Sequence, residues 1–223
     1  NNNPANPVIN TRSYGEDPHE VARLGVSFIH GLQDNGMIAT AKHFPGHGDT
    51  ETNSHLALPI VNVSRARLDT VELVPFRAAI KAGVGAVMTF HGSMPDLDSS
   101  GAPGTLSSKV VTGLLRNELG FNGLVISDAM DMKGVTDKYG STEAIKRAVA
   151  AGVDVLIQPL DVPAAIDAVV AGVSEGRYSE TRVSEAARRI LAMKRKLNLD
   201  RNRFANLDSL RTTVGDSAPI ALA

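Results

Sequence analysis

The sequence predicts an α/β protein in which strand, loop and helix alternate and the strands form a parallel sheet. Short apolar runs alternate four times with longer segments of helical periodicity. The runs are continuously apolar, which is typical of strands buried on both faces of a parallel sheet. Polar residues follow these runs directly, at the position where barrel and doubly wound enzymes hold their sites. These residues are Lys42, His43, His91 and Asp128.

Composition limits the classes of function. The 223 residues are 43% hydrophobic and 21% charged, as in a globular protein. A net charge of −1 with 4% aromatic residues gives no reason to expect nucleic acid or an anionic membrane as a partner. No apolar run approaches the roughly 18 residues of a membrane span. Cysteine is absent, which excludes disulfides.

The first segment, residues 1–16, is polar and contains Arg12. Its start, Asn1–Pro4, is neither an initiator methionine nor a signal peptide, so we expect the chain to begin inside a longer protein. The compartment, cytoplasmic or exported, is left open. A helix is predicted from Asp17-Pro18, a capping aspartate followed by proline, to a stop at Asn35-Gly36.

The remaining elements follow in order. Strands are predicted at 37–44, 86–90, 123–127 and 153–158, and helices at 64–82, 107–119, 141–151, 162–175 and 179–197. We predict a barrel domain over residues 1–200 and an irregular tail or linker over 201–223.

A (β/α) barrel fits this order better than a nucleotide-binding fold. No strand is followed by GxGxxG or GxxxxGK[ST], so the phosphate-binding loop of the alternative is absent. Four strands are too few to close an eight-stranded barrel. We therefore expect the C-terminal part of a TIM-type (β/α) barrel, with its early strands missing from this chain.

The stretch from Lys42 to His55 concentrates three histidines, a lysine and an aspartate in fourteen residues. His43 and His47 have the i, i+4 spacing of zinc ligands on a helix, but Pro45 and Gly46 break a helix between them. We therefore predict no metal and no cofactor. A structural loop and a catalytic or sugar-binding loop remain the alternatives.

Asp128 and His55 are the candidate reacting groups. A carboxylate just beyond an apolar strand can act as a nucleophile or base, and it can equally cap the next helix. Asp131 lies a turn further from the strand and is the weaker candidate. His55 lies in a loop, where it can transfer protons near neutral pH or can be a surface histidine without a role.

These residues resemble glycoside hydrolase family 3, in its β-N-acetylglucosaminidase branch. The motif Lys42–Thr50, followed by Ser54-His55 and Leu58-Pro59, is long and specific. Three weaker segments agree in order, and together they cover the chain to about residue 197. They are Asn10–Pro18, Leu73–Phe76 and Val125–Met130.

The resemblance implies a retaining enzyme that hydrolyses β-linked N-acetylglucosamine without a cofactor. It implies that Asp128 is the nucleophile, that His55 on a mobile loop is the acid/base, and that Arg12, Lys42 and His43 hold the sugar. His91 and Met132 are also predicted to bind the substrate. The partner would be a small carbohydrate such as a peptidoglycan (muropeptide) or chitin fragment.

The sequence departs from the family at Asn53, where an aspartate is usual, and it lacks the early strands that carry a further sugar-binding aspartate. Asn53 is included in the catalytic group as the neighbour of His55. A histidine acid/base leaves open transfer to phosphate, so a phosphorylase is an alternative. A non-catalytic sugar-binding protein on a degenerate or truncated barrel is another, and Asn53 favours it.

Overall fold

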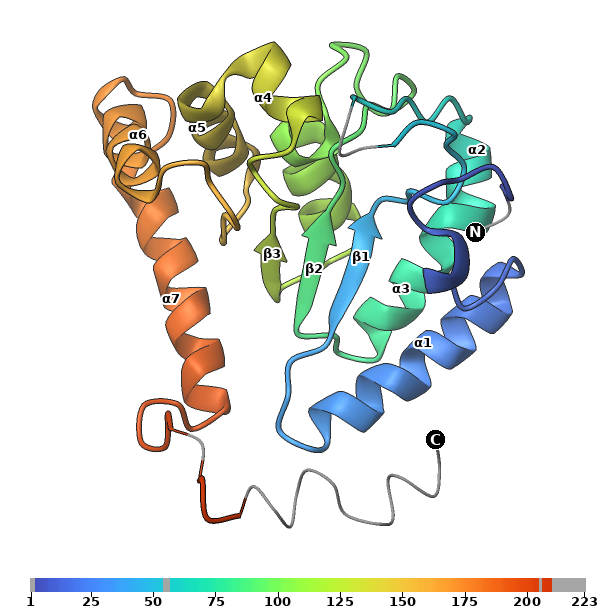
Figure 1. The fold of residues 1–223 in the computed structure, drawn as a ribbon, viewed down its shortest axis with the longest axis horizontal. Coiled ribbons are helices and arrows are strands. Elements are labelled where there is room, and N and C mark those ends of the chain that lie inside the picture. The colour runs from blue at the N-terminus through green and yellow to red at the C-terminus, as the bar shows by residue number, and fades with distance from the viewer. Residues whose placement is uncertain (1–2, 54–56, 205, 210–223) are drawn as a thin grey trace. The chain divides into compact units, whose positions relative to one another are not determined.

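The computed structural model describes residues 3–53, 57–204 and 206–209. The chain divides into two units, residues 1–190 and 191–223. The first contains the sheet and most helices (Figure 1). The described part of the second contains the end of one long helix, followed by turns. No described helix is both long and apolar enough to cross a membrane. The predicted division into 1–200 and 201–223 stays a prediction.

The elements alternate along the first unit as the pattern predicts. The strands are β1 (Thr40–Phe44), β2 (Ala86–Thr89) and β3 (Leu124–Ile126). The α-helices are α1 (Pro18–Gln33), α2 (Arg65–Arg67), α3 (Leu73–Lys81), α4 (Lys133–Tyr139), α5 (Ser141–Ala151), α6 (Val162–Ser174) and α7 (Glu180–Lys196). Four segments are 3-10 or wider helices: η1 (Asn10–Arg12), η2 (Leu68–Glu72), η3 (Gly104–Leu106) and η4 (Lys109–Glu118).

The three strands form a parallel sheet in the order β1-β2-β3, and their arrows point the same way in Figure 1. Ala41 is opposite Val87, and Val87 is opposite Val125. The register of β1 against β2 shifts between Ala41 and Phe44, which places one extra residue on β1. Such a bulge re-aims the side chains next to it. It occurs at Lys42 and His43, two of the predicted site residues.

The predicted fourth strand is wrong in extent. Within 153–158 only Val155 forms a bridge, to Ile126. The carboxylate of Asp154 accepts a hydrogen bond from the Val125 N–H at 3.0 Å. In a regular strand pair this N–H would instead donate to a backbone carbonyl of the neighbouring strand. Gln158 adopts a positive φ of 45° and ends the extended run. The chain therefore passes beside β3 without a regular ladder.

Helix boundaries follow their capping signals. Asp17 accepts the N–H groups of His19 and Glu20 at 2.8 and 3.0 Å, which begins α1 as predicted. Gly152 ends α5 with φ 116°. The helix α4 was not predicted, because its segment has no capping side chain: its N-cap, Met132, makes no side-chain bond. The helix predicted from residue 107 is the wide-turn helix η4.

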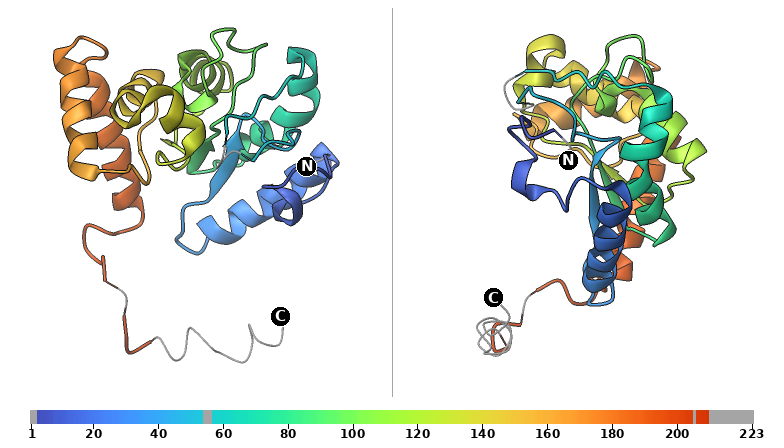
Figure 2. Two further views of the ribbon diagram at one scale, coloured as in Figure 1. Left: turned by 45° about the horizontal axis from the view of Figure 1, so that its top comes forward. Right: turned by 90° about the vertical axis from the view of Figure 1, so that its right-hand side faces the viewer.

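The core lies between the sheet and its helices. Phe44, Leu73, Phe90 and Leu115 are fully buried there. Phe44 packs edge-on against Phe76 of α3, with ring centroids 5.2 Å apart. In the side view of Figure 2 the N-terminal segment (dark blue) and α3 (teal) lie on opposite sides of β1. This packing holds the strands rigidly and leaves their carboxyl ends to carry the site.

Candidate active site

Asp128 lies two residues beyond β3, at the carboxyl end of the sheet. Its side chain is 16% exposed. Oδ1 accepts the N–H of Ala129 at 2.9 Å. The helix α4 begins only at Lys133, and the residue at its N-cap position is Met132, so Asp128 does not cap it. The structural alternative for Asp128 is therefore excluded, and a partly exposed carboxylate at a strand end remains.

His43 at the end of β1 faces Asp128. Its Nε2 lies 3.8 Å from Asp128 Oδ2, beyond hydrogen-bond length. Burial lowers the pKa of His43 to about 3, more than the neighbouring carboxylate raises it. The imidazole is thus neutral beside Asp128, and the pair is not an ion pair at neutral pH. Nδ1 is buried and has no hydrogen-bond partner among the described residues.

Lys42 and Arg12 lie on the same cavity as His43. The cavity has a volume of about 420 Å³ and is bounded by the N-terminal segment, α1, β1 and the start of α3. Lys42 is exposed on β1, and Arg12 ends η1 with its guanidinium bonded to the Val8 carbonyl at 3.2 Å. The structure brings together these three residues that were predicted to bind the sugar.

The histidine loop after β1 is packed from both sides. The ring of His47 lies 4.2 Å from that of Phe90, and its Nδ1 is 3.0 Å from the Thr50 hydroxyl. Gly46 lies against Glu72 of η2, so closely that a Cβ at position 46 would be 2.9 Å from the Glu72 side chain. Burial raises the pKa of Glu72. The peptide bonds Lys42-His43 and Phe44-Pro45 are cis.

His91 follows β2 and is completely buried. Its Nδ1 is 2.8 Å from the Thr105 hydroxyl, and its Nε2 is 3.0 Å from the Ala129 carbonyl. Burial lowers the pKa of His91. Both ring nitrogens are occupied within the protein. Contact between His91 and the sugar stays a prediction, and this burial argues against it.

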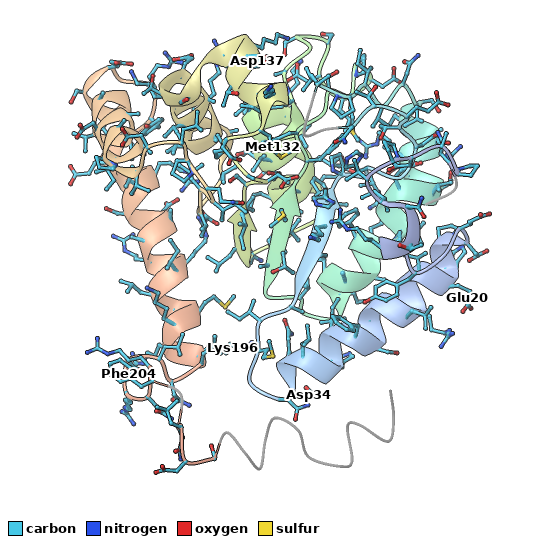
Figure 3. The ribbon with its side chains drawn as sticks, viewed as in Figure 1. Glu20, Asp34, Met132, Asp137, Lys196 and Phe204 are labelled. Atoms are coloured by element: carbon cyan, nitrogen blue, oxygen red, sulfur yellow. The ribbon has the colours of Figure 1, made fainter. Side chains whose placement is uncertain are left out.

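The remaining predicted site residues are Met132, Asn53 and His55. Met132 is 4% exposed and lies at the start of α4, above the carboxyl end of the sheet (Figure 3). Asn53 is half-buried, and its carbonyl accepts the Ala57 N–H at 3.1 Å. His55 lies outside the described residues. No three described His, Cys, Asp or Glu side chains are grouped as metal ligands would be.

Thr89 and Thr105 were missed by sequence reasoning. Both are fully buried, and their hydroxyls are 2.8 Å apart beneath His91. Thr89 could have been found, because it is the one polar residue near the end of the strand predicted at 86–90. Thr105 carries no such signal: it comes from a Pro- and Gly-rich loop that only the fold brings back to β2.

A parallel sheet with a carboxylate, two buried histidines and a lysine at its carboxyl end defines a barrel-type α/β enzyme class. Residues 1–193 match the glycosyl hydrolase family 3 N-terminal domain. The chain belongs to this family, whose N-terminal domain is a TIM-type (β/α) barrel, and the predicted fold class is thereby confirmed.

Individual relatives agree with this membership. Beta-hexosaminidase A of Pseudoalteromonas piscicida is 39% identical over 173 residues, which is 73% of this chain and 29% of that protein. A family 3 β-N-acetylglucosaminidase from Paenibacillus sp. str. FPU-7 superposes with a TM-score of 0.91 at 47% identity, over 97% of this chain and 42% of its own. Beta-glucoside phosphorylase BglX superposes with a TM-score of 0.92 at 30% identity, over 98% and 41%. The chain thus spans less than half the length of each of these three proteins.

Proposed function

We propose that this chain carries the reacting residues of a retaining glycosidase that releases β-linked N-acetylglucosamine from a small carbohydrate. The observation that carries the proposal is Asp128, a partly exposed carboxylate at a strand end that faces neutral His43. The similarity to proteins named β-hexosaminidase and β-N-acetylglucosaminidase supports the choice of sugar.

The proposed reaction has two displacements. Asp128 attacks the anomeric carbon, the glycosidic bond breaks, and the leaving oxygen keeps the electron pair of that bond and accepts a proton from His55. A water molecule then attacks the same carbon, His55 accepts the water's proton, and the bond to Asp128 breaks. The sugar leaves with its original anomeric configuration, and Asp128 and His55 return to their starting states.

The surrounding residues are proposed to bind the sugar. Lys42 and Arg12 reach the cavity with cationic donors, which suit hydroxyl and carbonyl oxygens. His43 lines the same cavity and is proposed to contact the sugar there. Because His43 is neutral, it forms no tight ion pair with Asp128 that attack would have to break. Met132 is proposed as an apolar neighbour of the sugar.

A nitrophenyl N-acetylglucosaminide and a mechanism-based fluoro-sugar test the proposal on the full-length protein. We expect release of nitrophenol and a covalent adduct on Asp128, located by mass spectrometry of peptides. Asp128→Ala should lower turnover by several orders of magnitude, since no other group can form the intermediate. Asp131→Ala, an exposed carboxylate three residues away, is the matched control and should be nearly as active as the wild type. An adduct on any other residue would contradict the assignment.

A phosphorylase is the second candidate, because the chain superposes on Beta-glucoside phosphorylase BglX over 98% of its length. A neutral imidazole base does not repel an anionic acceptor, whereas a carboxylate base does. Phosphate would then replace water in the second displacement and yield a sugar 1-phosphate. Analysis of the products formed with and without phosphate distinguishes the hydrolase from the phosphorylase. Release of free sugar at the same rate under both conditions supports the hydrolase.

A further inference from the structure

A buried chain of hydrogen bonds runs from β2 to the residue after Asp128. Thr89 lies 2.8 Å from Thr105, Thr105 lies 2.8 Å from His91 Nδ1, and His91 Nε2 lies 3.0 Å from the Ala129 carbonyl. Thr89, His91 and Thr105 are each 0% exposed. The chain therefore has no access to a sugar, and it ends one residue from the proposed nucleophile.

The chemistry of the partners fixes the protons in this chain. A carbonyl oxygen only accepts, so His91 Nε2 carries the proton and donates it to Ala129. Burial lowers the pKa of His91 and keeps the ring neutral, so Nδ1 has no proton. Nδ1 must then accept from the Thr105 hydroxyl, whose oxygen is left to accept from Thr89. The Thr89 and Thr105 hydroxyls also lie 3.3 and 3.2 Å from the Ile126 and Phe90 carbonyls, farther than from the partners in this chain, and the tautomer of His91 follows from the Ala129 carbonyl.

Ala129 links His91 to the nucleophile through both of its peptide groups. Its N–H donates to Asp128 Oδ1 at 2.9 Å, and its carbonyl accepts from His91 at 3.0 Å. Rotation of the Asp128 carboxylate would lose the first bond, and movement of the loop after β3 would lose the second. The two bonds together hold one oxygen of Asp128 and direct the other, Oδ2, toward His43.

We propose that His91 is a positioning residue that orients Asp128 through Ala129. This rests on the proposed function, in which Asp128 attacks the sugar. Its contribution is geometric: a nucleophile displaced by about 1 Å loses on the order of 100-fold in rate. The Thr89–Thr105 pair contributes by holding His91 in the tautomer that donates to Ala129.

Two substitutions of His91 separate positioning from packing. His91→Gln keeps an amide N–H at about the place of Nε2, whereas His91→Asn is too short to reach Ala129. We expect His91→Asn to lower kcat about 100-fold with KM little changed, and His91→Gln to recover much of that loss. His30→Asn, the same substitution on the exposed face of α1, should match the wild type.

Thr105 gives an independent pair of variants. Thr105→Val removes the hydroxyl that donates to Nδ1, and Thr105→Ser keeps it. We expect Thr105→Val to lower kcat and Thr105→Ser to remain close to the wild type. In the protein with ¹⁵N-labelled histidine, the Nδ1 resonance of His91 should show an unprotonated nitrogen in both proteins, and its chemical shift should change in Thr105→Val, where Nδ1 no longer accepts a hydrogen bond.

The rate of adduct formation on Asp128 by the fluoro-sugar decides between outcomes. An adduct that forms as fast in His91→Asn as in the wild type overturns the positioning role and leaves the proposed function intact. Equal losses of rate and of melting temperature in His91→Asn and His91→Gln would show that His91 acts only through packing, which also overturns it. Absence of any adduct on Asp128 in the wild type overturns both.

Discussion

His43 and His91 are both held neutral by burial, yet their ring nitrogens are used differently. Both nitrogens of His91 bond to the protein, whereas His43 keeps a buried nitrogen without a partner among the described residues. A buried donor or acceptor left unpaired costs about 1–3 kcal/mol. The protein thus fixes the ring of His91 at both nitrogens, whereas it leaves Nδ1 of His43 unbonded among the described residues.

Asn53 carries a prediction about the acid/base group. An aspartate at position 53 would raise the pKa of His55, because a nearby opposite charge favours the charged imidazole. In the full-length protein, Asn53→Asp should therefore move the alkaline limb of the pH–rate profile upward. It should also raise the rate on substrates with poor leaving groups, and change activated substrates less.

The pH–rate profile of Glu51→Gln is the control, because Glu51 is the carboxylate nearest to His55 in the sequence. If Asn53→Asp leaves the rate and the alkaline limb unchanged, position 53 is not the partner of His55. A downward shift in Glu51→Gln would then identify Glu51 as that partner.

At the scale of single elements, the contact between Gly46 and η2 fixes the loop after β1. A Cβ at position 46 would lie 2.9 Å from two carbons of Glu72, at a φ of 149°. Arg67, in α2 just before η2, lies 3.3 Å from Glu72 and 4.0 Å from Asp49 of the same loop. A change at Gly46 would therefore displace the loop that leads to Asn53.

We predict that Gly46→Ala lowers kcat by about 10-fold or more, since misplacement of a catalytic loop by a fraction of an ångström is costly. Gly36→Ala is the matched control: Gly36 also has a positive φ, 80°, but nothing lies within 4 Å of the added carbon. It should lose about 1 kcal/mol of stability and keep its kcat. Equal kcat in the two variants would show that the contact with Glu72 does not position the loop.

Asp154 is the electrostatic centre at the amino end of β3. Its buried carboxylate lies 2.5 Å from Arg116, 3.1 Å from Arg189 and 3.4 Å from Arg182. Arg116 also donates to the Phe121 and Gly123 carbonyls just before β3. Burial lowers the pKa of Arg116 and of Arg182, and the nearby Asp154 carboxylate opposes that shift.

Asp154→Asn should destabilise the protein by about 3–5 kcal/mol, because it leaves buried guanidinium groups without their counter-charge. Glu143→Gln is the control, since Glu143 bonds Arg147 and Arg177 at a more exposed site and should cost less than about 1 kcal/mol. Urea denaturation of both variants measures the difference. Similar losses in the two variants would contradict the role given to burial.

For the whole molecule, burial of His43 makes stability depend on pH. The unfolded imidazole has a pKa near 6.5 and the folded one near 3, so between these values the unfolded state binds more protons. Stability therefore rises with pH across this window and is lost as pH falls below 6.5. His43→Gln should reduce the slope of unfolding free energy against pH by up to about 1.4 kcal/mol per unit.

Urea midpoints from pH 6.5 to 4 measure this slope, with His30→Gln on the exposed face of α1 as the control. The control should follow the wild type. If His43→Gln has the wild-type slope as well, His43 titrates normally in the folded protein and is not held neutral by burial.

Strand order and direction were predictable because an apolar run followed by a polar residue is a local signal. It located β1, β2 and β3, and placed His43, His91 and Asp128 at one end of the sheet. The irregular pairing at 153–158 was not predictable from local signals. It depends on Asp154, whose carboxylate accepts the backbone N–H of Val125 in β3. Likewise, only the folded chain brings Thr105 to His91. Local patterns identify elements, whereas contacts between distant residues decide how they join.

The separation of Asp154 from Asp128 has a practical consequence for protein engineering. The Asp154 carboxylate bonds the N–H of Val125, three residues before Asp128, and at about 3.3 Å per residue of extended chain this puts the two carboxylates roughly 10 Å apart. Substitutions at sites this far apart have nearly additive effects. A library directed at the helix η4 and at α7 around Asp154 can therefore select for heat resistance without selecting against turnover. The residues around His43, where the sugar is proposed to bind, can be diversified separately, and the two sets of changes combined afterwards.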